Sequence, residues 1–346
     1  MGASRAVEVA HAQRFEGDGE QKFESKPRRL DRGVIVHALN DITRLALATM
    51  TLRARAASST GGSGLYVGAV DHDAWEGLAD LFVDEAYATV KGHVRTYVMH
   101  HHLLDHLPTA PATVLDVGGG AGSQSFPLAL AGYDVTLLDP STAMLDKARQ
   151  RREGLPVEAQ RRVTLVRAEG ERAGEALDGK RFDAVLCHGV LSYLDDPQPL
   201  VAELCRRTAA GGVVSIMTAN AQTMAVRPAM ERRWQDALAA FDSRREVGVL
   251  GVAARADTVE EVAEMLRLRG VEAIEWYGVW LFVDWLNFAG AALDPSDHRA
   301  VAATAGVELE ASRRDPYRQM SRVFHLLGRK LTQTEPHVGD PDARRR

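Results

Sequence analysis

One short stretch of the chain, VLDVGGGAGSQSF, begins at Val114 and holds four glycines between positions 118 and 122, two residues after Asp116. Glycines at the junction of a strand and a helix let a ligand touch the main chain. Two classes of cofactor use such a turn. Dinucleotides place a pyrophosphate there, whereas S-adenosylmethionine places its amino-acid end and its ribose there. The residue types therefore predict a nucleotide-type cofactor site.

The charge of Asp116 separates these two classes. A carboxylate beside the turn would repel a pyrophosphate, but it suits the ammonium and sulfonium charges of S-adenosylmethionine. The glycines follow the spacing GxGxG rather than the full GxGxxG of dinucleotide sites. Asp139, 23 residues after Asp116, suits a ribose diol in either class. Two simpler readings stay open: a tight connection without a ligand, and an Asp116 that only holds the turn through main-chain hydrogen bonds.

The surrounding residues predict the elements that position this turn. Apolar runs indicate strands at 112–118, 134–139, 163–169, 182–191, 211–220, 271–283 and 322–330. Helical segments lie between them at about 123–131, 141–152, 197–209, 258–270 and 297–312. Such alternation is typical of an α/β fold with a Rossmann-like, doubly wound, mostly parallel sheet. Because Pro127 is tolerated only in a first turn, we expect the first helix after the glycines to begin near Ser125 or to have a distorted first turn.

The flanks of this pattern differ in composition. Residues 1–62 are expected to be a partly disordered arm with one amphipathic helix at 33–56. This helix would pack on the domain or form a homodimer, and a helix on a membrane surface is the weaker alternative. Residues 63–332 are the predicted domain, opening with two helices that break near Lys91-Gly92. Residues 221–256 interrupt the alternation after the fifth strand, where ligands bind in such sheets, and are interpreted as a lid or acceptor-binding insertion. Residues 333–346 are expected to be a disordered tail.

Composition excludes several classes of function. The 346 residues carry a net charge of −5, which argues against a protein whose whole surface binds nucleic acid. The two cysteines, Cys187 and Cys205, have no metal-binding spacing, which favours a reducing cytoplasm. The sequence contains no run of 18 apolar residues, so no membrane span is predicted. The histidines at 100–102 would point in three directions from a helix, so no metal site is predicted.

Taken together, these residues resemble the class I S-adenosylmethionine-dependent methyltransferases. Within that class, residues 77–330 are similar to the bacterial tRNA 5-carboxymethoxyuridine methyltransferase group. The matching segments are LADLFVDEAYATVKGHVR, VLDVGGGAGSQSFPLALAGYDVTLLDPSTAMLDKAR, VLCHGVLSYLDDP and RDPYRQMSRVFHLLGRK. The resemblance implies a methyltransferase that binds S-adenosyl-L-methionine and releases S-adenosyl-L-homocysteine.

The resemblance also implies roles for individual residues. Arg95 would pair with the methionine carboxylate, Asp139 would take the ribose hydroxyls, and Ala168 and Glu169 would lie along the adenine. His188 would sit near the methionine end. The predicted cofactor-binding residues are Arg95, Asp116, Gly118, Gly119, Gly120, Asp139, Pro140, Met144, Ala168, Glu169 and His188.

Catalytic candidates follow from the chemistry of methyl transfer. A neutral hydroxyl or amine acceptor would need a base within hydrogen-bond reach, and His188, Tyr87 and the histidines at 100–102 are candidates. Tyr193 and Asn220, which follow the fourth and fifth strands, could orient an acceptor. The other reading for each residue is packing or capping. The predicted catalytic residues are His188, Tyr87 and Tyr193.

The acceptor is the point on which the chain departs from the group it resembles. The group carries arginine where this chain has Trp280, and a tryptophan suits a flat apolar acceptor better than a phosphate. We therefore expect a small-molecule acceptor, with oxygen or nitrogen as nucleophile, more than a tRNA. Arginines could still contact tRNA or be solvated helix faces; they are Arg227, Arg232, Arg233, Arg244, Arg245, Arg313, Arg314, Arg318 and Arg322. A cofactor sensor without catalysis and a dinucleotide oxidoreductase are weaker alternatives.

Overall fold

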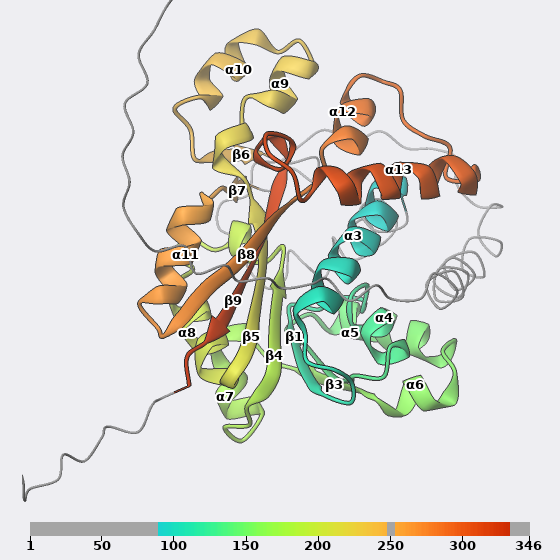
Figure 1. The fold of residues 1–346 in the computed structure, drawn as a ribbon, viewed down its shortest axis with the longest axis vertical. Coiled ribbons are helices and arrows are strands. Elements are labelled where there is room, and N and C mark those ends of the chain that lie inside the picture. Colours follow the sequence, from blue (N-terminus) through green and yellow to red (C-terminus); the bar gives the residue numbers. More distant parts are fainter. Residues whose placement is uncertain (1–88, 248–252, 333–346) are drawn as a thin grey trace, which may run out of the picture. The chain divides into compact units, whose positions relative to one another are not determined.

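The computed structural model describes residues 89–247 and 253–332 (Figure 1). They belong to the second of two units into which the chain divides, residues 45–346. The expected arm at 1–62 with its helix, the candidate Tyr87 and the expected tail at 333–346 lie outside the described residues.

A seven-stranded sheet forms the centre of the domain. Its strands follow the order β3 (Val163–Arg167), β2 (Asp134–Asp139), β1 (Thr113–Val117), β4 (Phe182–His188), β5 (Thr208–Ala219), β9 (Val323–Lys330) and β8 (Val271–Val279). The first five are parallel, whereas β9 runs antiparallel to both β5 and β8. The order reverses between β1 and β4, and open α/β sheets bind ligands beyond the carboxyl ends of strands at such a reversal. The predicted Rossmann-like, mostly parallel sheet is confirmed.

Helices cover both faces of this sheet (Figure 1). One face packs against α3 (Val90–His106), α4 (Ser125–Leu130), α5 (Thr142–Glu153) and α6 (Val157–Arg161). The other packs against α7 (Ala173–Ala176), α8 (Gln198–Arg207) and α11 (Val259–Arg267). Neighbouring residues of β1 divide between the two layers, Val114 into the first and Leu115 into the second, because side chains alternate along a strand.

Local signals set several helix starts. α4 begins at Ser125, so Pro127 falls in the first turn as predicted. The Ser141 hydroxyl accepts a hydrogen bond from the amide of Met144 at 3.3 Å and caps α5. Thr258 and Glu261 form a reciprocal capping box at the start of α11. These starts depend on residues within one turn, so the sequence could predict them.

One predicted boundary was wrong, and another is tested only in part. α3 begins at Val90, next to the expected break near Lys91-Gly92, where the Thr89 hydroxyl accepts a hydrogen bond from the amide of Gly92 at 3.2 Å. The first of the two expected helices lies outside the described residues. The strand expected to reach residue 283 ends at Val279, and α12 (Phe282–Phe288) takes its place. An apolar run alone does not separate a strand from a helix.

The reason for the early end of β8 is a distant carboxylate. Glu308, on α13 (His298–Ala311), is 2% exposed. It accepts hydrogen bonds from the amides of Leu281 and Val283 at 3.1 and 2.6 Å. These amides begin α12, and Trp280 makes the bend with a φ of 63°. A contact between residues more than 20 positions apart therefore decides the local structure.

The insertion after β5 is largely helical. It contains the short 3-10 helix η4 (Ala221–Thr223), α9 (Val226–Met230) and α10 (Trp234–Ala240), then the hairpin of β6 (Arg245–Val247) and β7 (Ala253–Arg255). Figure 1 shows α9 and α10 together, beyond the end of the sheet from which β5 leads into the insertion. Further 3-10 helices are η2 (Gly170–Arg172), η3 (Leu191–Tyr193) and η5 (Tyr317–Met320).

Candidate cofactor and active site

The glycine turn lies between β1 and α4 and remains joined to β2. The amides of Gly118 and Gly119 donate to the Leu138 carbonyl at 2.8 and 3.3 Å. A Cβ on Gly118 would lie 2.3 Å from the Val190 side chain, and its φ of 69° also favours glycine. The protein's own packing and backbone are therefore sufficient reasons for glycine at this position.

Gly120 is different. Its φ is 54°, yet among the described residues an added Cβ would meet only the Met144 sulfur, at 3.9 Å. Beyond that contact, no other described residue lies within 4 Å of an added Cβ. A ligand that approaches the backbone has room to do so at Gly120, next to the predicted cofactor contact Met144.

Asp139 fastens the turn to the end of β2. One carboxylate oxygen accepts from the Gly120 amide at 2.8 Å and the other from the Ser141 amide at 2.9 Å. The side chain is 6% exposed. Each carboxylate oxygen can accept more than one hydrogen bond, so these contacts are compatible with a ribose diol. The ribose role of Asp139 stays a prediction.

Asp116 lies at the carboxyl end of β1, beneath the turn. Its carboxylate accepts a hydrogen bond from the Ser125 hydroxyl at 2.6 Å, which ties β1 to the first residue of α4. Burial raises the pKa of Asp116 to about 6, against the opposing effects of the Ser125 hydrogen bond and the positive charge of Arg95. A buried carboxylate with a raised pKa favours a cation as a neighbour.

Two further predicted residues lie within electrostatic range. Arg95 on α3 is 5% exposed, and its Nε donates to the Met217 sulfur at 3.4 Å. Its charge affects the pKa of both Asp116 and His188. His188, the last residue of β4, places its Nε2 2.8 Å from the Ser215 hydroxyl. Its Nδ1 is buried and has no hydrogen-bond partner among the described residues. The fold thus brings Arg95, Asp116 and His188 together from three elements.

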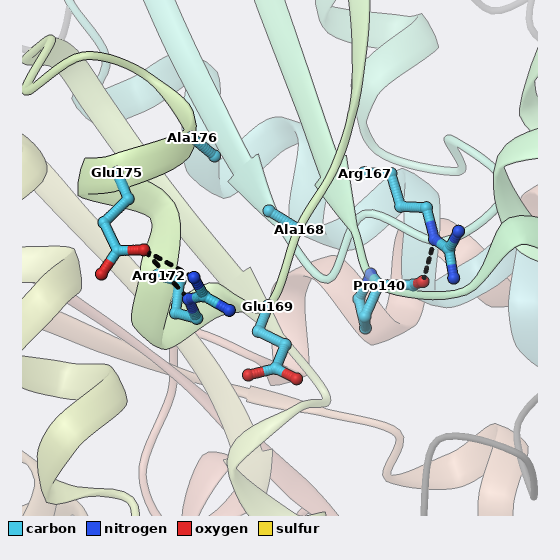
Figure 2. Close-up of a pocket in the computed structure, with 7 residues that line it drawn as sticks. All are labelled: Pro140, Arg167, Ala168, Glu169, Arg172, Glu175 and Ala176. Carbon is cyan, nitrogen blue, oxygen red and sulfur yellow. Dashed lines mark hydrogen bonds and ion pairs between the residues drawn. The ribbon is translucent and has the colours of Figure 1, made fainter.

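A cavity of about 690 Å³ opens where β2 and β3 end. Its lining includes three predicted cofactor contacts, Pro140, Ala168 and Glu169. Figure 2 shows Ala168 between two polar contacts. The Arg167 side chain donates to the Pro140 carbonyl at 3.2 Å on one side, and Arg172 pairs with Glu175 on the other. The volume lies within the range of small-molecule sites.

The lining also contains residues that the sequence did not indicate. Arg167, Arg172, Glu175 and Ala176 complete the cavity, and Ser125 and Ser215 bond predicted site residues. The only available signal was position, since residues 167–176 follow the third strand directly. No spacing pattern marks Ser215 or its partners, because they come from separate elements.

Other candidates have structural partners. The Asn220 amide donates to the carbonyls of Gln319 and Ser321 at 3.2 and 3.0 Å, and its oxygen accepts from the Gln222 amide at 3.0 Å. Asn220 is therefore used as a cap. The Trp280 indole donates to the Lys91 carbonyl at 2.9 Å, and the Lys91 ammonium lies 4.3 Å from its ring centroid. Both residues therefore have contacts within the protein, and their roles toward an acceptor stay predictions.

The histidines at 100–102 diverge as predicted. His101 Nδ1 lies 2.9 Å from the Tyr97 carbonyl, whereas His102 is fully buried against β9. In the part of the chain that the structure describes, no group of three or more candidate side chains could hold a metal ion. Within the same residues, no helix combines the length and the apolar character that crossing a membrane requires.

Comparisons with known proteins agree with this geometry. Residues 115–214 match the family model described as a methyltransferase domain. The chain is 26% identical over 262 residues to the tRNA 5-carboxymethoxyuridine methyltransferase of Escherichia coli, an alignment that covers 74% of this chain and 95% of the relative. It is 30% identical over 153 residues to a ubiquinone biosynthesis O-methyltransferase of a Methylobacterium species, covering 42% of this chain and 58% of the relative.

Among solved structures, the chain is similar to magnesium protoporphyrin IX methyltransferase from Synechocystis PCC 6803, with a TM-score of 0.48 and 15% identity. That alignment covers 87% of this chain and all of the other.

Proposed function

We propose that this chain, which is a class I S-adenosylmethionine-dependent methyltransferase, transfers a methyl group to an oxygen or nitrogen atom of a small molecule. The proposal concerns the acceptor and the residues that act, because the reaction class follows from the family match and the relatives.

The residues at the site fit the proposed cofactor. The buried Arg95 would pair with the methionine carboxylate, and Asp116, whose pKa burial raises to about 6, would meet the cationic groups. Open space at Gly120 allows contact with the backbone. Asp139 would take the ribose. Pro140, Ala168 and Glu169 line the cavity of about 690 Å³ in which we place the adenine.

The mechanism requires positioning above all. When bound, S-adenosylmethionine supplies a methyl group attached to a positively charged sulfur, and S-adenosylhomocysteine is the product. Residues such as Arg95 and Asp139 would hold the cofactor so that the acceptor approaches the methyl group in line with its bond to sulfur. Well-oriented reactants can lower a barrier by roughly 7–11 kcal/mol. Asp116 would neutralise charge beside the sulfur without transferring a proton.

A proton must leave a neutral hydroxyl or amine acceptor. His188 is the predicted base, because it is the last residue of β4 and its Nδ1 has no hydrogen-bond partner among the described residues. Burial lowers the pKa of His188 well below its usual value, so the side chain is neutral but only weakly basic. Tyr193, in η3 just beyond β4, would orient the acceptor, and Tyr87 stays a prediction outside the described residues. A carboxylate or phenolate acceptor would need no base, so the effect of removing His188 reports which kind of acceptor is used.

The pairing of the arginines is the observation that carries the small-molecule proposal. Eight of the nine arginines that could contact tRNA form ion pairs with carboxylates of this chain. They are Arg227, Arg233, Arg244, Arg245, Arg313, Arg314, Arg318 and Arg322. Such pairing leaves little unbalanced positive charge for a polyanion.

The insertion supports an apolar acceptor as well. On α10 and its C-cap, Trp234, Leu238 and Phe241 are 62%, 63% and 76% exposed. Their spacing of four and three residues puts them on one face of the helix. An exposed apolar face next to the carboxyl end of β5 suits a lipophilic molecule better than a phosphate backbone.

A tRNA acceptor is the second candidate. It is favoured by the relatives that align along nearly their whole length, the tRNA 5-carboxymethoxyuridine methyltransferases, whereas the ubiquinone enzymes align over a shorter part. A wobble-uridine carboxylate would then be the nucleophile.

Two buried unpaired cysteines suit a reducing compartment such as the cytoplasm, and a homodimer through the N-terminal helix stays a prediction.

The test compares the two acceptors directly. Calorimetry with S-adenosylhomocysteine should show binding to the full chain. Transfer of labelled methyl groups should then occur to apolar phenols or hydroxyquinones and not to undermodified tRNA. Arg244→Glu with Arg245→Glu reverses two exposed charges of the insertion and should leave small-molecule turnover unchanged. Methylation of tRNA that is lost in this double variant, with binding that falls steeply with salt, would refute the small-molecule proposal.

A further inference from the structure

A buried chain of polar side chains leads away from His188 through the sheet. His188 Nε2 lies 2.8 Å from the Ser215 hydroxyl on β5, which lies 2.7 Å from His325 Nε2 on β9. His325 Nδ1 lies 3.2 Å from His102 Nδ1 on α3, and His102 Nε2 lies 2.8 Å from the Ser312 hydroxyl, at the end of α13. All five residues are at most 7% exposed.

Ser312, at the far end of this series of hydrogen bonds, determines which atom donates the proton in each of them. The Ser312 hydroxyl donates to the Leu309 carbonyl at 2.7 Å, and a carbonyl oxygen can only accept. Ser312 must therefore accept from His102 Nε2–H. A neutral histidine has one donor and one acceptor nitrogen, so His102 Nδ1 accepts from His325 Nδ1–H. His325 Nε2 then accepts from the Ser215 hydroxyl.

The same assignment of donors and acceptors extends to His188. Because the Ser215 proton goes to His325, its oxygen accepts from His188 Nε2–H, which leaves a lone pair on His188 Nδ1. The opposite direction would leave a buried N–H donor without a partner at that atom, which is costly. We propose that Ser215, His325, His102 and Ser312 are positioning residues that hold His188 in the Nε2–H tautomer, with Nδ1 ready to accept a hydrogen bond from a ligand.

The environment keeps the three histidines neutral, as is required if each has one donor and one acceptor nitrogen. Burial lowers the pKa of His188 and of His102 well below the usual value, and that of His325 to about 3. The charged and titratable groups that act on them, Arg95, Arg313, His101 and His106, lower the pKa values further. Within the part of the chain that the structure describes, no carboxylate raises the pKa of these three histidines.

This inference rests on the proposed function only for the identity of the ligand. The donor that meets Nδ1 is an N–H or O–H group. It belongs either to the ammonium of the cofactor or to the acceptor, and the two sources predict different kinetics. The tautomer itself is a property of the ligand-free protein, so it can be tested even if the proposed acceptor is wrong.

The first experiment measures the tautomer by ¹⁵N NMR of histidine-labelled full-length protein. The resonances of His188 are identified as those that disappear from the spectrum of His188→Gln. We expect His188 to be protonated at Nε2. Ser312→Ala, four links away, should produce a second population protonated at Nδ1. Ser321→Ala is the matched control, because it removes a buried hydroxyl that contacts a carbonyl and no histidine. An Nδ1–H signal in the wild type, or a His188 signal unaffected by Ser312→Ala, would overturn the proposal.

The second experiment tests the consequence. Ser215→Ala removes the acceptor of His188 Nε2–H, whereas His325→Gln keeps one donor and one acceptor and should be milder. If Nδ1 meets the cofactor ammonium, Ser215→Ala weakens S-adenosylhomocysteine binding about tenfold. If it meets the acceptor, kcat falls about tenfold and that affinity is unchanged. A shifted tautomer with neither effect would contradict the role of Nδ1. Failure of wild-type protein to bind S-adenosylhomocysteine would instead count against the proposed cofactor site.

Discussion

Replacing Gly120 by alanine tests the location of the cofactor most directly. Of the residues that the structure describes, an added Cβ at this position meets only the Met144 sulfur, at 3.9 Å, so these residues leave room for it. The φ of 54° nevertheless makes a side chain unfavourable, by about 1–2 kcal/mol. If the cofactor touches this backbone, the methyl group also occupies part of its space.

Gly270 provides a matched control. Its φ is 72°, no atom of residues 89–247 or 253–332 lies within 4 Å of an added Cβ, and it lies between α11 and β8. Gly270→Ala should therefore lose the same 1–2 kcal/mol or so of stability, which corresponds to a fall in Tm of several degrees. It should leave ligand binding unchanged. The two variants separate backbone strain from a lost ligand contact.

The expected loss in affinity follows from overpacking. An extra methyl group in a filled space costs about 1–3 kcal/mol, which corresponds to a loss of about 5- to 140-fold. Calorimetric titration of both variants with S-adenosylhomocysteine, beside thermal unfolding, measures the two effects. Equal affinities for Gly120→Ala and Gly270→Ala would refute the reasoning, because they would mean that no ligand approaches the turn at Gly120.

Three further variants test other parts of the structure. Since the pKa of Asp116 is about 6, affinity for S-adenosylmethionine should fall as the pH drops through 6 and this carboxylate is protonated; Asp116→Asn should bind weakly at every pH, without that slope. The pKa of His325, lowered from 6.5 to about 3, makes the native state resist protonation, so stability is complete above pH 6.5 and is lost as the pH falls toward 3. Between pH 7 and pH 5, the free energy of unfolding measured with a chemical denaturant should fall by about 2 kcal/mol more in wild type than in His325→Gln. Identical pH profiles would show that His325 titrates normally. Glu308→Ala should lower the free energy of unfolding by about 1–3 kcal/mol through loss of the α12 cap, whereas Glu310→Ala, an exposed neighbour on the same helix, should change it by less than about 0.5 kcal/mol.

Residues close in sequence were sufficient to predict much of this protein. The glycine turn, the alternation of strands and helices, the start of α4 at Ser125 and the cap at Ser141 all depend on neighbours within a few positions. The same holds in part for the predicted site residues Asp116, Asp139 and His188, which lie at or next to the ends of β1, β2 and β4. The carboxyl ends of parallel strands meet at one edge of a sheet, so the sequence could predict that these residues share that edge. The sheet order then places β1 between β2 and β4.

Only the tertiary structure decided the rest. Glu308 turns an apolar run into the helix α12, and the hydrogen bonds from His188 to Ser312 join four further elements, with His102 and His325 separated by 223 positions. No local pattern marks such pairs, because a buried donor or acceptor is satisfied by whichever group the packing brings within about 3 Å. The sequence by itself predicted where a cofactor would meet the sheet. The packing of α3, β5, β9 and α13 sets the hydrogen bonds from which we infer the protonated nitrogen of His188.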